Sequence, residues 1–181
     1  EWRKLRADVS GDGNIYAYDA SLILQRVVGL ISSFPVEDQT RVTPVANVNV
    51  AYYNGELVLS SPDFKDLYSL NLSFELPQNA ETGQPAFTES FSSALWNQFT
   101  DNNIWNFALA CLNPSEGYGN ICNIPISFAN STTLVLNLVI NETPNTITLE
   151  CQPTSVQDLV AGINFLAQNR PNPFNPSTTL Y

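Results

Sequence analysis

The chain contains no histidine and no methionine, and only 13% of its 181 residues are charged. Without histidine, the usual serine and cysteine nucleophile arrangements lack their general base. Lysine and arginine together number 7 against 17 acidic residues, which gives a net charge of -10. This balance argues against an electrostatic patch for nucleic acid or for an anionic membrane.

Long apolar runs are also missing. No stretch approaches the roughly 20 apolar residues of a membrane helix, so we expect no membrane span. No signal peptide is recognisable and the chain opens at Glu1, so we expect any export signal to have been removed. With 44% hydrophobic residues, the composition is that of a folded chain rather than a disordered one.

Cysteine is scarce, and the number of cysteines is odd. Cys111, Cys122 and Cys151 permit one disulfide with one free thiol, or no disulfide at all. Of the three pairs we favour Cys111 with Cys122, because the connection between them is short. Their spacing is not that of a zinc site, since there is no CxxC and no histidine.

Oxygen-bearing residues recur at regular positions between Asp8 and Asp19, in the stretch DVSGDGNIYAYD. In the twelve-residue calcium loop, the ligand positions one, three, five, seven, nine and twelve correspond to Asp8, Ser10, Asp12, Asn14 (through its carbonyl), Tyr16 (through a water) and Asp19. Gly13 is the sixth residue, where the turn requires a positive φ. Oxygen ligands without sulfur or imidazole favour calcium over transition metals. The sequence therefore predicts a calcium site, and the alternative is an acidic surface turn.

A helical periodicity follows the loop directly. Apolar residues recur at intervals of three and four residues, namely Ala20, Ile23, Leu24, Val27, Val28 and Ile31. This spacing predicts an amphipathic helix that starts at the last ligand and buries this stripe. Gly29 and the Phe34-Pro35 pair are expected to end it.

An acidic loop that leads into such a helix, with Asp at its twelfth position, resembles a dockerin repeat. A complete dockerin has two such repeats, and only one is found here, so residues 1–7 (EWRKLRA) would be the remnant of a connection from an earlier repeat. The resemblance implies a partner protein at loop positions ten and eleven and along the helix. In this chain those candidate partner-binding residues are Ala17, Tyr18, Ser21, Leu22, Gln25 and Arg26.

Between Thr40 and Pro153 the periodicity changes to that of strands. Turns recur every eight to twelve residues, and the alternation of apolar and polar residues predicts strands at 48–53, 56–60, 68–76, 105–112, 124–128, 134–140 and 146–151. Asn54-Gly55 is a strong two-residue hairpin signal. One helical turn is expected near 90–98. Short antiparallel strands in such number predict a mainly β fold, an antiparallel β-sandwich, with the loop and helix as a small EF-hand-like addition at its amino-terminal side.

The segments ANVNVAYYNGELVL, LYSLNLSFELP and GYGNICNIPISFANSTTLVLNLVINE resemble the strand succession of the cohesin family, the jelly-roll sandwich that receives dockerins. A generic immunoglobulin-like sandwich is the alternative. The final segment, NFLAQNRPNPFNPSTTLY, resembles the opening of the C-terminal sorting domain of type IX secretion substrates, which implies export to the cell surface or medium. The expected division is therefore 1–36 for the calcium loop and helix, 37–155 for the sandwich, and 156–181 for a linker and the start of the sorting segment.

These features predict a non-catalytic, secreted, calcium-binding interaction module whose partners are other modules of cohesin or dockerin type. A self-assembling extracellular filament subunit is the alternative, because a donor-like end and an acceptor-like sandwich can make head-to-tail or strand-addition contacts between copies. A lesser alternative is a carbohydrate-binding module with an aromatic platform of Tyr52, Tyr53, Trp96, Trp105 and Tyr118. Asn-x-Ser/Thr motifs at Asn71, Asn130 and Asn141 permit glycans. We do not expect an enzyme, because no carboxylate pair can be identified.

Overall fold

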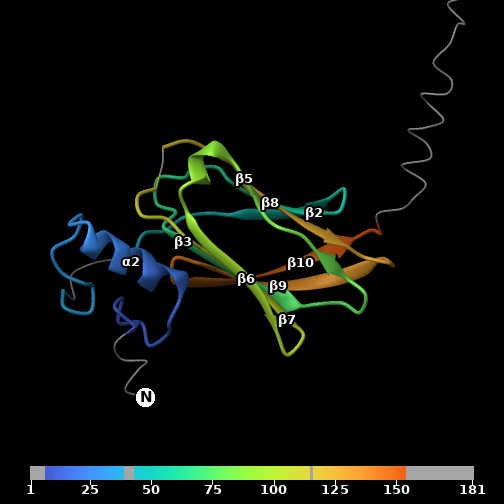
Figure 1. The fold of residues 1–181 in the computed structure, drawn as a ribbon, viewed down its shortest axis with the longest axis horizontal. Coiled ribbons are helices and arrows are strands. Elements are labelled where there is room, and N and C mark those ends of the chain that lie inside the picture. Colours follow the sequence, from blue (N-terminus) through green and yellow to red (C-terminus); the bar gives the residue numbers. More distant parts are fainter. Residues whose placement is uncertain (1–6, 39–42, 115, 154–181) are drawn as a thin grey trace, which may run out of the picture.

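The computed structural model describes residues 7–38, 43–114 and 116–153, which form two antiparallel sheets and one α-helix. Figure 1 shows the sheets as two layers, with β2 and β8 in one and β6, β7 and β9 in the other. The mainly β sandwich predicted from the strand alternation is therefore confirmed. Residues 1–6 and 154–181, which include the segment that resembles a sorting domain, lie outside the described residues.

The first sheet, sheet A, has the order β1-β2-β8-β4, and β5 also pairs with β8. Its strands are β1 (Asn49–Tyr53), β2 (Glu56–Ser61), β4 (Glu81–Thr82), β5 (Ala86–Phe87) and β8 (Gly119–Ser127). The β1–β2 hairpin turns at Asn54 and Gly55, with φ of 50° and 81°. Two successive positive φ values are those of a type I′ turn, so the predicted hairpin is confirmed.

The second sheet, sheet B, has the order β10-β9-β3-β7-β6. Its strands are β3 (Ser69–Glu75), β6 (Leu95–Asp101), β7 (Ile104–Ala110), β9 (Thr132–Ile140) and β10 (Thr143–Cys151). A short 3₁₀ helix, η1 (Glu89–Phe91), precedes β6. The helical turn expected near 90–98 is thus only partly correct, because from Leu95 onward the chain pairs with β7 as a strand.

The core lies between the two sheets and is almost entirely aliphatic and aromatic. In β3, β7, β8 and β9 the residues that point into it alternate with outward-facing ones, as in β9, where Leu134, Leu136 and Leu138 are buried while Val135 and Asn137 are exposed. Trp105 is buried in it, with the ring of Phe107 parallel at 6.1 Å and the ring of Phe74 tilted at 5.1 Å between centroids. This period of two is what a strand with one buried face requires.

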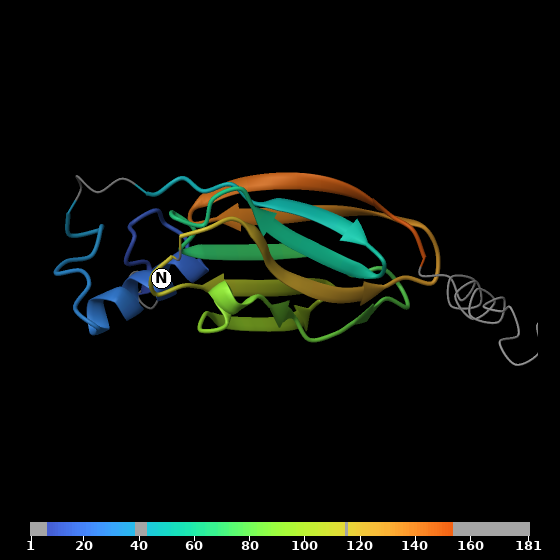
Figure 2. The ribbon, with the colours of Figure 1, turned by 90° about the horizontal axis from the view of Figure 1, so that it is seen from above.

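The helix α2 (Ala17–Val27) packs against β3 and β7 at one end of the sandwich, as Figures 1 and 2 show. It begins two residues before the last loop position rather than at it. Its buried residues are Tyr18, Asp19, Ser21, Leu22 and Gln25. No helix in the described part of the chain is both long and apolar enough to cross a membrane.

The predicted apolar stripe of α2 is on the wrong face. Ile23, Val27 and Val28 are 38%, 76% and 55% exposed, whereas Leu22 is fully buried. The covered face combines polar and apolar contacts: the Ser21 hydroxyl donates to the Cys111 carbonyl at 2.5 Å, and Leu22 belongs to a small apolar cluster with Val9 and Tyr18. Tyr18 meets Tyr68 edge to face. Helical periodicity identifies an apolar stripe on a helix, but it does not show which face of the helix the rest of the protein covers.

Candidate metal loop and binding face

The first half of the acidic loop is closed by the carboxylate of Asp8. Its Oδ1 accepts the N–H of Gly11 at 2.7 Å and its Oδ2 accepts the N–H of Gly13 at 2.9 Å. The Ser10 hydroxyl also donates to Asp8 Oδ1, at 3.3 Å. Gly13 has a φ of +88°, as its loop position requires. The loop thus brings the residues of positions one and three together and wraps the backbone on both sides of position five around Asp8.

The last loop residue, Asp19, has a structural role that the sequence did not reveal. It is 2% exposed, and its Oδ1 accepts the N–H groups of Val9 and Ser10 at 2.9 and 3.1 Å. Its Oδ2 accepts the N–H of Tyr16 at 2.9 Å, at the start of α2. One buried carboxylate therefore ties the entry of the loop to the first turn of the helix, where a negative charge is also favoured by the helix dipole.

The donor chemistry of the loop fits a calcium ion in its first half. Within the described ranges, no group of three or more His, Cys, Asp or Glu side chains is placed to hold a metal ion. The predicted set also depends on the Ser10 hydroxyl and the Asn14 carbonyl, which are not acidic. Each carboxylate oxygen has two lone pairs, so Asp8 Oδ2, Asp12 Oδ1 and Asp19 Oδ2, which each accept one N–H bond, keep a lone pair for a cation. Asp8 Oδ1 and Asp19 Oδ1 already accept two bonds each. Asp19 differs from the other two in being buried.

The residues predicted to meet a partner protein contact the chain itself. Among these residues, Tyr18, Ser21, Leu22 and Gln25 are buried against sheet B, and Gln25 Nε2 donates to Ser21 Oγ at 3.1 Å. Ala17 is half-buried, and Arg26 is exposed. This arrangement corrects the expectation of a free binding face there: four of the six side chains form an internal interface, and a partner could reach them only if α2 left the sheet.

The outer face of sheet B is the exposed surface that the loop adjoins. The alternation of the strands places these residues on it: Asn71, Ser73, Asn97, Phe99, Ile104, Asn106, Ala108, Val135, Asn137 and Val139. We call this set the B face. Phe99 and Val135 are 52% and 54% exposed. None of these residues is charged, but Glu75 and Asp101 lie on the same side of the sheet, at the strand ends, where each is directly opposite Ile104.

The loop and the B face are continuous. Ile15 and Tyr16 line a cleft of about 250 Å³ together with Asn71, Phe99 and Ala108. The Ala17 N–H donates to Asn71 Oδ1 at 3.0 Å, which holds the loop against β3. Sequence reasoning missed this surface because it considered loop and strands as separate modules.

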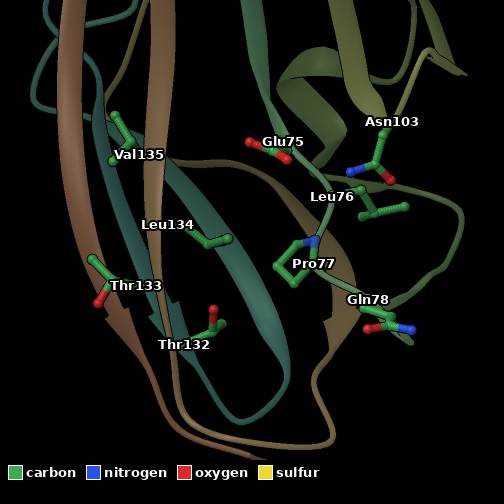
Figure 3. A pocket seen from close by; sticks show the side chains of 9 residues that line it. All are labelled: Glu75, Leu76, Pro77, Gln78, Asn103, Thr132, Thr133, Leu134 and Val135. Atoms are coloured by element: carbon green, nitrogen blue, oxygen red, sulfur yellow. The ribbon is translucent and has the colours of Figure 1, made fainter.

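A second cleft of about 430 Å³ lies near the other end of sheet B. Figure 3 shows its two sides: Glu75 ends β3 and Leu76, Pro77 and Gln78 follow it, while Thr132–Val135 belong to β9. Glu75 is the one titratable side chain that lines it. A single carboxylate does not provide the acid and base pair of glycoside hydrolysis.

The proposed aromatic platform is not assembled. Trp105 is 1% exposed and belongs to the core. Tyr53 lies on β1 in sheet A and Trp96 on β6 in sheet B. Trp96 packs on Phe87 with ring centroids 5.5 Å apart. The five residues therefore form no common stacking surface, which corrects that prediction.

The asparagine motifs differ sharply in accessibility. Asn141 is fully buried, so the prediction of a glycan there is wrong. The Asn71 amide oxygen is occupied by Ala17, and a glycan would compete with the docking of α2. Asn130 is exposed and remains a candidate for glycosylation.

The three cysteines are free and buried, so the favoured pair of Cys111 with Cys122 is not bonded. Cys122 belongs to β8 in sheet A, whereas Cys111 follows β7 in sheet B. Burial raises the pKa of Cys111 to about 11 and that of Cys122 to about 12. Burial, with a smaller effect of the Glu150 charge, raises the pKa of Cys151 to about 11.

These raised thiol pKa values predict an alkaline loss of stability. Between the ordinary pKa of 9.0 and about 11, the unfolded chain releases thiol protons that the folded chain retains. The free energy of unfolding should therefore decrease as pH rises through this window and should show no thiol contribution below it. Denaturant unfolding at pH 7 and pH 10 measures the decrease, and a variant with all three cysteines changed to alanine should lose it. Rapid labelling of native thiols at pH 8 would contradict the prediction.

No family model and no curated protein matches the sequence. Among solved structures, the fold is similar to a non-cellulosomal cohesin from the hyperthermophilic archaeon Archaeoglobus fulgidus. The TM-score is 0.40 and the sequence identity 11%, over 66% of this chain and 89% of that chain. This likeness concerns the arrangement of the strands and nothing beyond it.

Proposed function

We propose that the chain is a secreted, non-catalytic protein–protein interaction module that binds its partner on the B face. The observation that carries the proposal is the character of this face: its carboxylates, Glu75, Asp101 and Glu150, lie at the strand ends, and the surface between them is uncharged. Phe99, Ile104 and Val135 are exposed on it. On a sheet face that meets only solvent, the outward strand positions are usually polar and often charged. Depletion of charge with exposed aromatic residues is instead typical of the central part of a protein interface.

Calcium has a defined place in this proposal. Asp8, Ser10, Asp12 and the Asn14 carbonyl would hold the ion, which would neutralise the acidic loop and fix its turn. Ile15 and Tyr16 follow these ligands directly and line the cleft on the B face. A bound ion would therefore set the position of the residues that extend the binding surface. The dockerin-like loop and the cohesin-like sandwich would act together on one partner.

An extracellular location is part of the same proposal. It is supported by the resemblance of residues 164–181 to a sorting segment and by the oxygen-only ligand set, since extracellular modules often bind calcium at millimolar concentrations. A partner of cohesin or dockerin type, presented by another exported protein, is the class that the two resemblances favour.

Affinity capture from the medium and surface fraction of the source cells tests the proposal. The wild-type chain should retain a defined set of proteins in calcium, and Phe99→Asp should lose them because it replaces an exposed aromatic residue of the B face by a charge. Tyr53→Asp is the matched control, since Tyr53 is an exposed aromatic residue on β1 of sheet A, 68% accessible. A chelator should weaken retention. Equal loss with both variants would show that the B face has no special role.

A further inference from the structure

The strand β6 forms an open edge of sheet B. In the described part of the chain it pairs only with β7, in a continuous register from Leu95 to Asp101. It contains no proline and no bulge, and its single charge, Asp101, is its last residue. Proteins usually protect such an edge with charges, prolines, bulges or a covering segment. The unpaired N–H and C=O groups of β6 therefore offer a place for an added strand.

The side chains along this edge are apolar and accessible on both faces. Leu95 and Phe99, on the outer face, are 57% and 52% exposed. Trp96 is directed to the other face and is 39% exposed beside Phe87 of sheet A. An added strand with apolar residues on both of its faces would cover all three side chains.

Between the sheets at this edge, the side chain of Gln98 also has a hydrogen-bond acceptor without a donor within the ranges that the structure describes. Gln98 Nε2 donates to the Gly83 carbonyl at 3.1 Å and so bridges β6 to sheet A. Its Oε1 is buried and has no hydrogen-bond donor among the described residues. Buried acceptors are normally satisfied. Two kinds of hydrogen-bonding groups therefore lack partners at this edge among the described residues: the outer backbone groups of β6 and the side-chain oxygen of Gln98.

The chain itself carries a segment with matching chemistry. Residues 159–167 read LVAGINFLA and contain no charged residue. Alternate positions are all apolar, namely Leu159, Ala161, Ile163, Phe165 and Ala167, and the positions between them are Val160, Gly162, Asn164 and Leu166. As a strand, the first row would continue the inner layer beside Trp96, and the second would lie beside Leu95 and Phe99. These residues lie outside the described part of the chain.

The connection before the segment is too short for all of residues 159–167 to pair with β6 of the same chain. Gln152 still lies beside β9, because its Oε1 accepts the Ser131 hydroxyl at 2.9 Å. A strand added to β6 would be five strand spacings away from β10, or about 24 Å across the sheet. The six residues that lead from Pro153 to Leu159 span at most about 20–22 Å when fully extended. A second copy has no such limit.

We propose that β6 accepts residues 159–167 of a second copy of this chain as an added strand of sheet B. Each copy then donates its carboxyl-terminal segment and accepts another at β6, which is a heterologous contact that produces open linear assemblies unless a ring closes. This inference goes beyond the binding of a partner on the B face and does not require calcium.

Cysteine cross-linking between two different single variants tests the contact. Asn97→Cys, on the exposed face of β6, is mixed with Asn164→Cys that carries a mass tag, and the mixture is oxidised. The native thiols are buried and free, so the background should be low. We expect a disulfide-linked dimer of one tagged and one untagged chain. Thr146→Cys is the matched control, because it lies at an exposed position on β10, the opposite edge of the same sheet, and should give about tenfold less of this dimer.

Three outcomes would overturn the proposal. One is equal cross-linking of the β6 and β10 variants. Another is a purely intramolecular disulfide in the Asn97→Cys/Asn164→Cys double variant. The third is a wild-type full chain that sediments as a monomer at high micromolar concentration. In the same sedimentation experiment, Phe99→Lys on the edge and Ile163→Asp in the segment should each weaken association by about tenfold or more, while their circular dichroism stays that of the wild type.

Discussion

Replacing Asn141 by alanine is expected to destabilise the protein by roughly 3–5 kcal/mol, the largest effect of any single polar substitution proposed. Its Oδ1 accepts the N–H groups of Tyr68 and Ser69, both at 3.1 Å. Its Nδ2 donates to the carbonyls of Pro44 and Asp66 at 2.6 and 2.9 Å. One buried amide thus satisfies four backbone groups from two separate segments, and alanine would leave all four unpaired. Denaturant unfolding measures the loss.

Two further variants separate the causes of this loss. Asn141 has a φ of 53°, so part of the alanine effect is backbone strain, which Asn141→Gly avoids while it still removes the four bonds. Asn145→Ala is the matched control: Asn145 is exposed and makes one long bond, at 3.3 Å, so its loss should stay within about 0.5 kcal/mol. A loss below about 1 kcal/mol for both Asn141 variants would show that water replaces the amide.

The same residue shows the limit of a motif. The sequence Asn141-Glu142-Thr143 satisfies the glycosylation pattern, and nothing local distinguishes it from Asn130. What differs is tertiary: Asn141 forms a tight turn between β9 and β10, where the segments around Pro44 and Asp66 enclose it. Contacts between residues more than seventy positions apart leave no trace in a local pattern.

Strands were predictable where burial is one-sided. The alternation of Leu134, Leu136 and Leu138 identified β9, and Asn54-Gly55 identified the β1–β2 hairpin. The strand β6 was not predicted, because it is an edge strand with little buried surface and its side chains show no alternation of apolar and polar residues. A usable signal was present in Asn102 and Asn103, whose φ values of 47° and 66° form the hairpin turn to β7. Asparagine tolerates positive φ better than other residues with a side chain.

The helix illustrates a different limit. Its existence followed from the spacing of apolar residues, but the covered face did not, because the sheet beneath it contributes the Cys111 carbonyl and the Asn71 amide. Hydrogen bonds of this kind add Ser21 and the Ala17 backbone to a covered face that also buries Tyr18 and Leu22. Because part of this face is polar, hydrophobic periodicity alone predicts the wrong orientation of the helix.

In calcium-free buffer, Asp19→Ala is expected to loosen the loop and the first turn of α2, because it removes three charge-assisted hydrogen bonds that the carboxylate accepts from the N–H groups of Val9, Ser10 and Tyr16. The expected loss of local stability is about 3 kcal/mol, which corresponds to roughly 100-fold faster amide exchange in α2. Hydrogen exchange measures this effect directly, and the exchange of the core strands β3 and β9 serves as the internal reference. Unchanged exchange in α2 would show that the buried carboxylate is not what holds the loop.

Asp12→Ala is the matched variant that separates the structural carboxylate from the ligand carboxylates. Asp12 is exposed and accepts one N–H bond, from Asn14 at 2.7 Å, so its loss should change α2 exchange little without calcium. If the loop binds calcium through its first half, the same substitution should weaken binding at least about tenfold in a calorimetric titration of the wild-type and variant chains. The two aspartates would then have different roles: Asp19 holds the loop to the start of α2 with or without an ion, and Asp12 contributes only by binding the ion. A wild-type chain that takes up no calcium at millimolar concentration would leave the first role intact and eliminate the second.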